Sequence, residues 1–328
     1  MARIALDAMG GDFAPAAPVG GAIEALGELP SSCEVLLVGR ADDIEAELAS
    51  YGSSSERLHI VHAPETIEMG EKPLAAVRGK RRSSIRVGLE LQKESEADAF
   101  ISGGNTGAVM AASTLLLGLH PGVERAAIAA LFPTAAKPVL VIDAGANIDC
   151  SPRELRGFAH IGSVYAHDVL GRHEPAVGLL NIGEEEEKGN EAVRHAFELL
   201  QGDERINFVG NVEGRDIVTG DLDVVVCDGF VGNVVLKFYE SVARLFTNLL
   251  QREMDRDVLE SSAMGRVLEV LDYSTYGGAP LLGVRGVSVI CHGRSPARAF
   301  KNAIHVALRS VESNLSQHIG VELAGGTA

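Results

Sequence analysis

The hydrophobic pattern of the chain alternates between two kinds of segment. Short runs rich in Val, Ile and Leu predict strands that are buried on both faces. They occur at 3–7, 35–39, 58–62, 99–102, 127–131, 139–143, 177–181, 206–209, 223–227 and 287–291. Most alternate with stretches of helical period, at 44–49, 74–91, 108–117, 153–170, 191–200 and 297–315. This order predicts an α/β fold, with a largely parallel sheet and helices on both of its faces.

One region interrupts this alternation. Residues 230–254 form one long helical pattern, and a second amphipathic stretch follows at 258–271, before a loop with Gly and Pro at 273–286. Two consecutive helices without a strand between them predict a helical arm, at about 230–271, that projects from the sheet. We expect residues 1–318 to form a single catalytic α/β domain, either undivided or as two lobes around a cleft. Residues 319–328 are expected to form a C-terminal tail.

The turns that follow the predicted strands are rich in Gly, Asn and Asp. The segment Ser102–Gly107 reads Ser-Gly-Gly-Asn-Thr-Gly and stands between a predicted strand and a predicted helix. Its uncovered backbone N–H groups and the helix dipole favour an anion, most plausibly phosphate, although a tight turn with small residues would have the same composition. Similar turns occur at 10–12, 143–147, 181–183 and 228–233. Loops at the carboxyl ends of strands line the ligand crevice of an open α/β sheet.

Composition excludes several classes of protein. The formal net charge of −16, the absence of Trp and an aromatic content of 5% argue against nucleic acid as a partner. The four cysteines form no CxxC pair, and no Cys/His cluster has zinc-ligand spacing, so no metal is expected. A strand-like segment at the N-terminus and the lack of a long apolar run predict a cytoplasmic protein with no leader or membrane span.

Two charged segments are candidates for binding. Five of the nine residues at 78–86 are basic, which fits a docking patch for an acidic protein, a phosphate cradle, or a solvated helix face. The acidic run at 184–187 precedes a predicted helix, whose dipole it would favour, and Lys188 follows it as a candidate cation near the cleft.

Motifs for covalent catalysis and nucleotide binding are absent from the sequence. It has no Gly-x-Ser-x-Gly elbow, no HExxH, no P-loop and no Gly-x-Gly-x-x-Gly fingerprint. The cysteines are interpreted as small core residues, with Cys227 inside a predicted strand. What remains is an anion site without an obvious covalent nucleophile.

Five segments together resemble one known family. Residues 4–12, 101–108, 181–191, 228–233 and 276–283 are similar to the bacterial phosphate acyltransferases of phospholipid synthesis, the PlsX-type enzymes. The resemblance runs in order from about residue 3 to about residue 310. The basic stretch departs from the family, which usually has Asp where this chain has Arg82.

The resemblance implies transfer of a fatty acyl group from acyl carrier protein to inorganic phosphate, giving acyl phosphate, without a cofactor. It also implies a fold like those of the isopropylmalate dehydrogenases and phosphotransacetylases, and a homodimer. Finally, it implies peripheral association with the inner membrane face, with contact to the downstream membrane acyltransferase.

Such a reaction requires substrates held in line and donors aimed at the developing oxyanion. The expected catalytic residues are Asn105, Lys188, Asn233 and His292. The expected substrate-binding residues are Asp7, Gly10, Gly11, Asp12, Ser102, Gly103, Gly104, Thr106, Gly107, Asp143, Asn147, Asn181, Gly183, Asp228, Gly229 and Gly232. Within that set, the carboxylates of Asp7, Asp143 and Asp228 are expected to fix loops. Carrier-protein docking is assigned to Arg78, Lys80, Arg81 and Arg82.

Two other functions stay open at this point. The first is a decarboxylating nicotinamide-dependent dehydrogenase on the same fold, which the missing fingerprint disfavours. The second is a non-enzymatic scaffold that binds acyl carrier protein at the membrane. Phosphate-dependent loss of a carrier-protein thioester would separate the acyltransferase from both.

Overall fold

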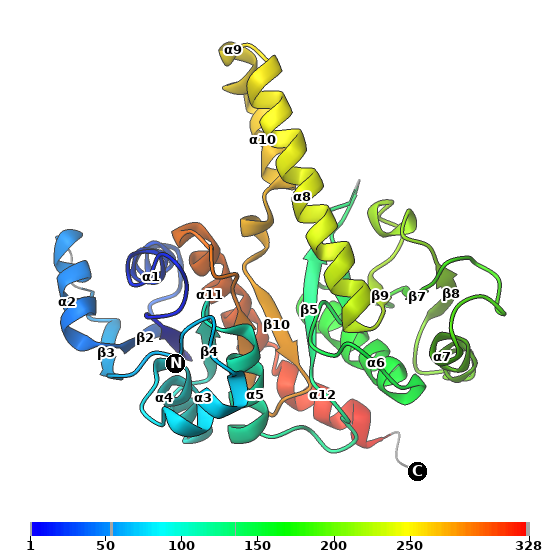
Figure 1. Ribbon diagram of the computed structural model, residues 1–328, viewed down its shortest axis with the longest axis horizontal. Coiled ribbons are helices and arrows are strands. Elements are labelled where there is room, and N and C mark those ends of the chain that lie inside the picture. The colour runs from blue at the N-terminus through cyan, green and yellow to red at the C-terminus, as the bar shows by residue number, and fades with distance from the viewer. Residues whose placement is uncertain (1, 53–54, 135, 326–328) are drawn as a thin grey trace.

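The structure is a computed structural model that describes residues 2–52, 55–134 and 136–325. Its centre is an 11-stranded sheet with the order β3-β2-β1-β4-β11-β10-β5-β6-β9-β7-β8 (Figure 1). The strands are β1 Ala2–Asp7, β2 Cys33–Gly39, β3 Leu58–His62, β4 Ala99–Ser102, β5 Ala127–Phe132, β6 Val139–Ile142, β7 Val177–Leu180, β8 Phe208–Val212, β9 Val224–Val226, β10 Ala279–Leu282 and β11 Val287–Ile290. Strands β3, β2, β1, β4 and β11 are parallel, and so are β6, β9, β7 and β8. The largely parallel sheet is therefore confirmed.

Two antiparallel strands stand between these parallel halves. Strand β10 runs antiparallel to both β11 and β5, and β5 runs antiparallel to β6. Consequently, the strands on the β8 side of the sheet run opposite to those on the β3 side.

Helices cover both faces of the sheet, as predicted. They are α1 Ala16–Glu28, α2 Ala41–Ser50, α3 Pro73–Gly79, α4 Ser84–Lys93, α5 Thr106–Leu116, α6 Pro152–Asp168, α7 Glu191–Gln201, α8 Gly229–Glu253, α9 Arg256–Leu259, α10 Ser262–Leu271, α11 Ala297–Glu312 and α12 Leu315–Ala324. Short 3₁₀ turns occur at Asp216–Val218 and Tyr273–Tyr276. One hydrophobic core joins α3, α4, α5 and the N-terminal half of α8 to the sheet. A second core joins α1, α2 and α11 to the sheet, and a third joins α6, α7 and α12 to it.

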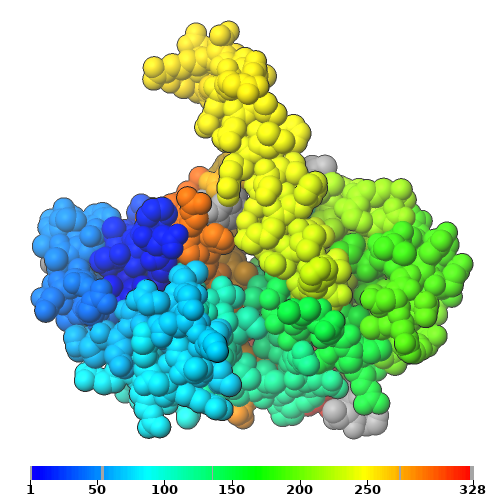
Figure 2. All heavy atoms as spheres, in the orientation of Figure 1, coloured from blue at the N-terminus to red at the C-terminus, as the bar shows by residue number. Residues whose placement is uncertain are grey.

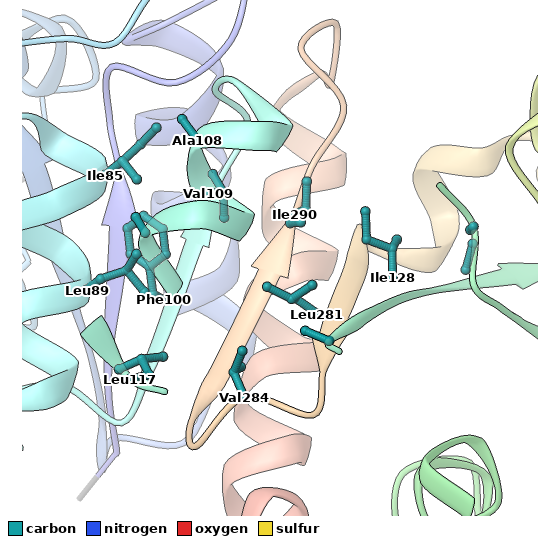
Figure 3. Packing of buried hydrophobic residues seen from close by; sticks show 14 of the residues in the cluster. Ile85, Leu89, Phe100, Ala108, Val109, Leu117, Ile128, Leu281, Val284 and Ile290 are labelled. Atoms are coloured by element: carbon teal, nitrogen blue, oxygen red, sulfur yellow. The ribbon is translucent and has the colours of Figure 1, made fainter. Parts of the chain in front are cut away.

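The first of these cores supports the loops discussed below. Phe100 of β4 is fully buried against Ile85 and Leu89 of α4 and Val109 of α5 (Figure 3). A Cβ atom at Gly88 would lie 2.4 Å from the Phe100 ring, so α4 approaches the sheet closely only because that position has no side chain. This packing holds the starts of α4 and α5 next to the end of β4.

The predicted arm is present. Helix α8 leaves the body of the molecule, α9 lies at its far end, and α10 returns beside it (Figure 1). The space-filling view shows the arm standing clear of the body (Figure 2). Phe238, Leu245 and Phe246 of α8 are more than half exposed, which leaves an apolar surface along the arm. Among the described residues, no helix has the length and apolar character needed to cross a membrane.

Several boundaries differ from the sequence prediction. The stretch 74–91 is two helices, separated by a turn at 80–83, and 258–271 is divided at 260–261 into α9 and α10. Residues 319–324, expected in the tail, belong to α12, where Ile319 and Leu323 are buried. The strand predicted at 206–209 begins instead at Phe208.

Besides α12, two elements were missed because glycine or proline weakens their local pattern. Strand β10 lies in the predicted loop at 273–286, where Gly and Pro dominate the local pattern. Helix α1 contains Gly20 and Gly21, which lower helix propensity. A Cβ atom at Gly21 would lie 2.5 Å from the carbonyl oxygen of Ala297, so these glycines permit close packing against α11.

Candidate active site

The loop after β1 is organised by a buried carboxylate. Asp7 is 1% exposed, and its Oδ1 accepts a hydrogen bond from the N–H of Met9 at 3.0 Å. The Ser102 hydroxyl, at the end of β4, donates to Oδ2 at 2.7 Å and accepts from the N–H of Gly104 at 3.0 Å. Burial raises the pKa of Asp7, although these hydrogen bonds oppose the shift. Asp7 thus ties together the loops after β1 and β4, as expected for a residue that fixes loops.

The glycines of these loops permit close backbone contacts. A Cβ atom at Gly10 would lie 2.7 Å from the N–H nitrogen of Gly104, and one at Gly103 would lie 2.8 Å from the Phe300 ring. Gly11 has a φ of +107°, and the neighbouring Asp12 N–H donates to the carbonyl of Gly293 at 2.7 Å. The loops after β1, β4 and β11 therefore form one packed cluster, which we call the first loop set.

Asn105 has a different role from the one expected. Its Oδ1 accepts the Ala108 N–H at 3.0 Å and caps α5, while its Nδ2 donates to the carbonyls of Glu68, Met69 and Glu71. The side chain is thus committed within the protein and is not a free donor for an oxyanion. Thr106 is exposed in the first turn of α5, where backbone N–H groups have no partner within the helix. These N–H groups replace the Asn105 amide as candidate oxyanion donors.

The loop after β6 is organised by Asp143, which is fully buried. Its Oδ1 accepts N–H groups from Ile128, Gly145 and Ala146, and its Oδ2 accepts both the N–H and the Nδ2 of Asn147. Burial raises the pKa of Asp143, again opposed by these bonds. The carboxylate and the Asn147 amide are fully used inside the loop, so both position backbone instead of facing a substrate.

The loop after β9 leads into α8. Asp228 accepts the Val231 N–H at 2.8 Å and caps the helix, which confirms the expectation that it fixes backbone. The Gly229 N–H donates to the carbonyl of Asn147 at 2.7 Å, and a Cβ atom at Gly232 would lie 1.9 Å from the Asp143 carbonyl oxygen. Asn233, one turn further on, is exposed and remains a candidate donor.

The loop after β7 is more open. The Asn181 Nδ2 donates to the carbonyl of Lys188 at 3.1 Å, and a Cβ atom at Gly183 would lie 2.7 Å from a Glu185 carboxylate oxygen. The Lys188 ammonium lies 4.0 Å from Glu185, with 45% of its side chain exposed. Lys188 is therefore paired within its own loop. The loops after β6, β9 and β7 make up the second loop set.

The expected site residues come from two loop sets. Because strand direction reverses between β11 and β6, Asn105 and His292 belong to the first set, whereas Lys188 and Asn233 belong to the second. Periodicity in the sequence carries no information on strand direction. Helix α8 connects the two loop sets, because it begins in the second set and runs past His292 of the first set.

His292 lies where α8 runs past the first loop set. It is exposed at the end of β11, and its Nδ1 accepts the Arg294 N–H at 3.1 Å. Partial burial lowers the pKa of His292, the nearby Lys237 cation lowers it further, and Glu240 and Asp12 oppose the shift. Lys237 and Glu240 both belong to α8, where their side chains pair at 2.9 Å. The sequence analysis missed this pair, although a Lys and a Glu three residues apart on one helix face was a readable signal.

The remaining candidates separate into buried and exposed groups. Cys227 and Cys291 are buried, and burial raises the pKa of Cys291 to about 12 and that of Cys227 well above its usual value. In the basic stretch, the Lys80 ammonium bonds the Thr66 carbonyl at 2.7 Å and pairs with Glu71, so it is held locally. Arg78, Arg81 and Arg82 are exposed. Among the described residues, no group of three or more His, Cys, Asp or Glu side chains is arranged to hold a metal ion.

These features define an α/β protein with glycine-rich turns at the ends of its strands and four cysteines whose thiols lie in no activating environment, since burial raises the pKa of Cys33, Cys150, Cys227 and Cys291. Solved structures share the fold: a phosphotransacetylase from Streptococcus pyogenes matches with a TM-score of 0.63 at 17% identity, covering 95% of this chain and 94% of that one. A branched-chain phosphotransacylase from Enterococcus faecalis V583 matches with a TM-score of 0.61 at 14% identity, covering 95% and 99%. At these identities the likeness establishes the fold.

Sequence relatives define the family. The model of the family described as "Fatty acid synthesis protein" matches residues 2–318, and the chain belongs to this family. A phosphate acyltransferase from Desulforamulus reducens is 50% identical over 321 residues, covering 96% of this chain and 95% of the relative. One from Heliobacterium modesticaldum is 50% identical over 332 residues, covering 98% of each. The family resemblance expected from the sequence motifs is confirmed.

Proposed function

We propose that this chain is an enzyme that transfers a fatty acyl group from acyl carrier protein to inorganic phosphate, giving acyl phosphate for phospholipid synthesis. The observation that carries this conclusion is the 50% identity to phosphate acyltransferases over nearly the whole chain. Neither the nicotinamide dehydrogenase nor the non-enzymatic scaffold is favoured by these relatives.

The mechanism is direct attack. A phosphate oxygen adds to the thioester carbonyl, the C–S bond then breaks, and the thiolate leaves on the carrier protein. A substantial share of inorganic phosphate is dianionic near pH 7 and the leaving thiol has a pKa near 8.5, so neither group requires strong activation. Because both substrates are held in place, most of the acceleration comes from orientation and from donors aimed at the oxyanion.

This chain supplies those donors without a covalent intermediate. The first-turn N–H groups of α5, next to Thr106, face the developing oxyanion, and the positive end of the helix dipole favours it. Lys237 on α8 adds positive charge beside the first loop set, and this cation together with partial burial lowers the pKa of His292. Asp7 and Asp143 hold the loops.

The test is a thiol-release assay. Acylated carrier protein is incubated with the enzyme, with and without phosphate, and free thiol and acyl phosphate are measured together. Phosphate-dependent release with one acyl phosphate per thiol supports the proposal. Carrier-protein binding without thiol release would contradict it and support a scaffold, and turnover only with a nicotinamide cofactor would indicate a dehydrogenase.

Docking of the acidic carrier protein is assigned to Arg78, Arg81 and Arg82, whose exposed charges act at long range and are screened by salt. Reversing the charge with Arg81→Glu and Arg82→Glu should reduce transfer from acyl carrier protein more than transfer from acyl-coenzyme A. The difference between the donors should shrink as salt is raised. Equal loss with both donors would place these arginines in the phosphate site.

The arm is proposed to mediate assembly and membrane contact. The exposed apolar surface of α8 is suited to a second copy of the chain around a two-fold axis, giving a homodimer. At the far end, Val258 of α9 is 43% exposed and Met264 of α10 is half-buried, and both are proposed to touch lipid at the inner membrane face, near the downstream membrane acyltransferase. Val258→Glu combined with Met264→Glu should abolish binding to anionic vesicles while the dimer and its activity remain. Dissociation to monomers would contradict the membrane assignment.

A further inference from the structure

The start of helix α4 holds two buried hydroxyl groups without partners. Ser83 is 0% exposed and Ser84 is 1% exposed, yet neither hydroxyl oxygen has a hydrogen-bond partner among the described residues. Buried polar groups in folded proteins are nearly always bonded, and leaving one unpaired is costly. The two hydroxyls together therefore indicate a polar ligand at this position.

The local backbone adds further donors. Ser83 precedes α4 in an extended conformation, which is the N-cap position, but its side chain does not cap the helix. The Ser84 N–H donates to the carbonyl of Glu65, and the N–H groups that follow in the first turn have no partner within a helix. Helix α4 has 10 residues, long enough for its dipole to favour an anion at this end.

This helix start adjoins the first loop set. The Ser84 hydroxyl is near enough to lower the pKa of the Asp7 carboxyl, although it misses hydrogen-bond geometry. The Ile85 side chain would lie 3.4 Å from a Cβ atom at Gly104, and Figure 3 shows Ile85 beside Ala108 at the start of α5. The starts of α4 and α5 thus converge beside the loop after β4.

The loop after β4 alone is less open to an anion than its sequence indicates. The Gly104 N–H is already bonded to Ser102, and Gly103 packs against Phe300. Burial raises the pKa of Asp7. Exposed Arg81 and Arg82 lie on the turn that leads into α4.

We propose that the hydroxyls of Ser83 and Ser84, together with the first-turn N–H groups of α4, bind the phosphate that attacks the thioester. The inference rests on the proposed acyl transfer to phosphate. It places the oxygens of phosphate on two hydroxyl donors and backbone N–H groups, and leaves the start of α5 for the carbonyl of the acyl donor. The two substrates then meet between two helix starts.

The test compares Ser83→Ala and Ser84→Ala, singly and combined, with Ser113→Ala. Ser113 is equally buried but its hydroxyl bonds Ser288 at 3.2 Å, away from these loops. Steady-state thiol release gives KM for phosphate and for acyl carrier protein separately. A phosphate titration of the thermal unfolding midpoint, without acyl donor, reports binding independently of turnover.

Removing a hydroxyl that bonds an anion should raise KM for phosphate about tenfold in each Ser83 or Ser84 variant. KM for acyl carrier protein should stay within about twofold. Without phosphate the unfolding midpoint of Ser83→Ala should not fall, because its hydroxyl has no hydrogen-bond partner to lose among the described residues, whereas Ser113→Ala should lower the midpoint. Ser84→Thr, which keeps the hydroxyl, should restore phosphate binding.

An unchanged KM for phosphate in the double variant, with phosphate-dependent thiol release intact in the wild type, would overturn the inference and leave the proposed function standing. If the wild type shows no phosphate-dependent release, the proposed function fails. In that case the dependence of the thermal unfolding midpoint on phosphate tests the proposed binding site independently of turnover. An equal phosphate response in wild type and both serine variants would exclude it.

Discussion

Replacing Asp143 with Asn should markedly destabilise the folded protein, although the two side chains have nearly the same size and shape. The carboxylate accepts five hydrogen bonds, three at Oδ1 and two at Oδ2. An Asn side chain keeps one acceptor oxygen and places an NH₂ group against the two donors of Asn147. Those two bonds are lost, and donors are left facing donors in a fully buried site.

The magnitude follows from the number of bonds lost. Hydrogen bonds to a charged group contribute roughly 1.5–3 kcal/mol each, so two amount to about 3–6 kcal/mol. Burial raises the pKa of Asp143, so the charged form carries a desolvation cost that the neutral Asn avoids. The expected net loss is therefore near the lower end, about 3 kcal/mol.

The assay is urea unfolding at pH 7, followed by circular dichroism. With a slope of about 3 kcal/mol per molar urea, the midpoint of Asp143→Asn should fall by about 1 M. Asp228→Asn is the matched control, because Asn and Asp cap helices equally well and the α8 cap needs only one acceptor. Equal midpoints for the two variants would refute the argument that Asp143 holds the loop through its carboxylate.

Two further predictions concern titratable groups near the loops. Cys227→Ala and Cys291→Ala should each keep most of the turnover, because burial raises the pKa of both thiols and so disfavours the nucleophilic thiolate. A cysteine-linked acyl adduct in the wild type would contradict direct attack. His292 has a lowered pKa in the folded protein, so its contribution to stability is lost as pH falls below the usual value of 6.5. Between pH 7.5 and pH 5.5 the thermal unfolding midpoint should therefore fall further in the wild type than in His292→Gln. An equal fall in the two proteins would contradict this.

Elements with a strong local pattern were predictable from the sequence. The apolar runs that became β4, β6 and β9 are fully buried strands, and the 25-residue helix α8 was visible as a continuous helical period. The turns that carry Asp7, Asp143 and Asp228 were recognised as structured loops, because Gly, Asn and Asp after an apolar run predict a turn at a strand end. The family followed from the same motifs.

The sequence by itself determined the class of fold, the arm and the residues of the loops, because these depend on local propensity and periodicity. Only the tertiary structure decided which loops meet, since strand direction depends on the pairing of β10 and β5, which are separated by about 150 residues in sequence. It also decided which polar side chains are free. The Asn105 side chain makes four hydrogen bonds, whereas the hydroxyls of Ser83 and Ser84 meet no hydrogen-bond geometry with any described residue. That difference arises from the packing of α3, α4 and α5 around the end of β4. Neighbours distant in sequence set both outcomes.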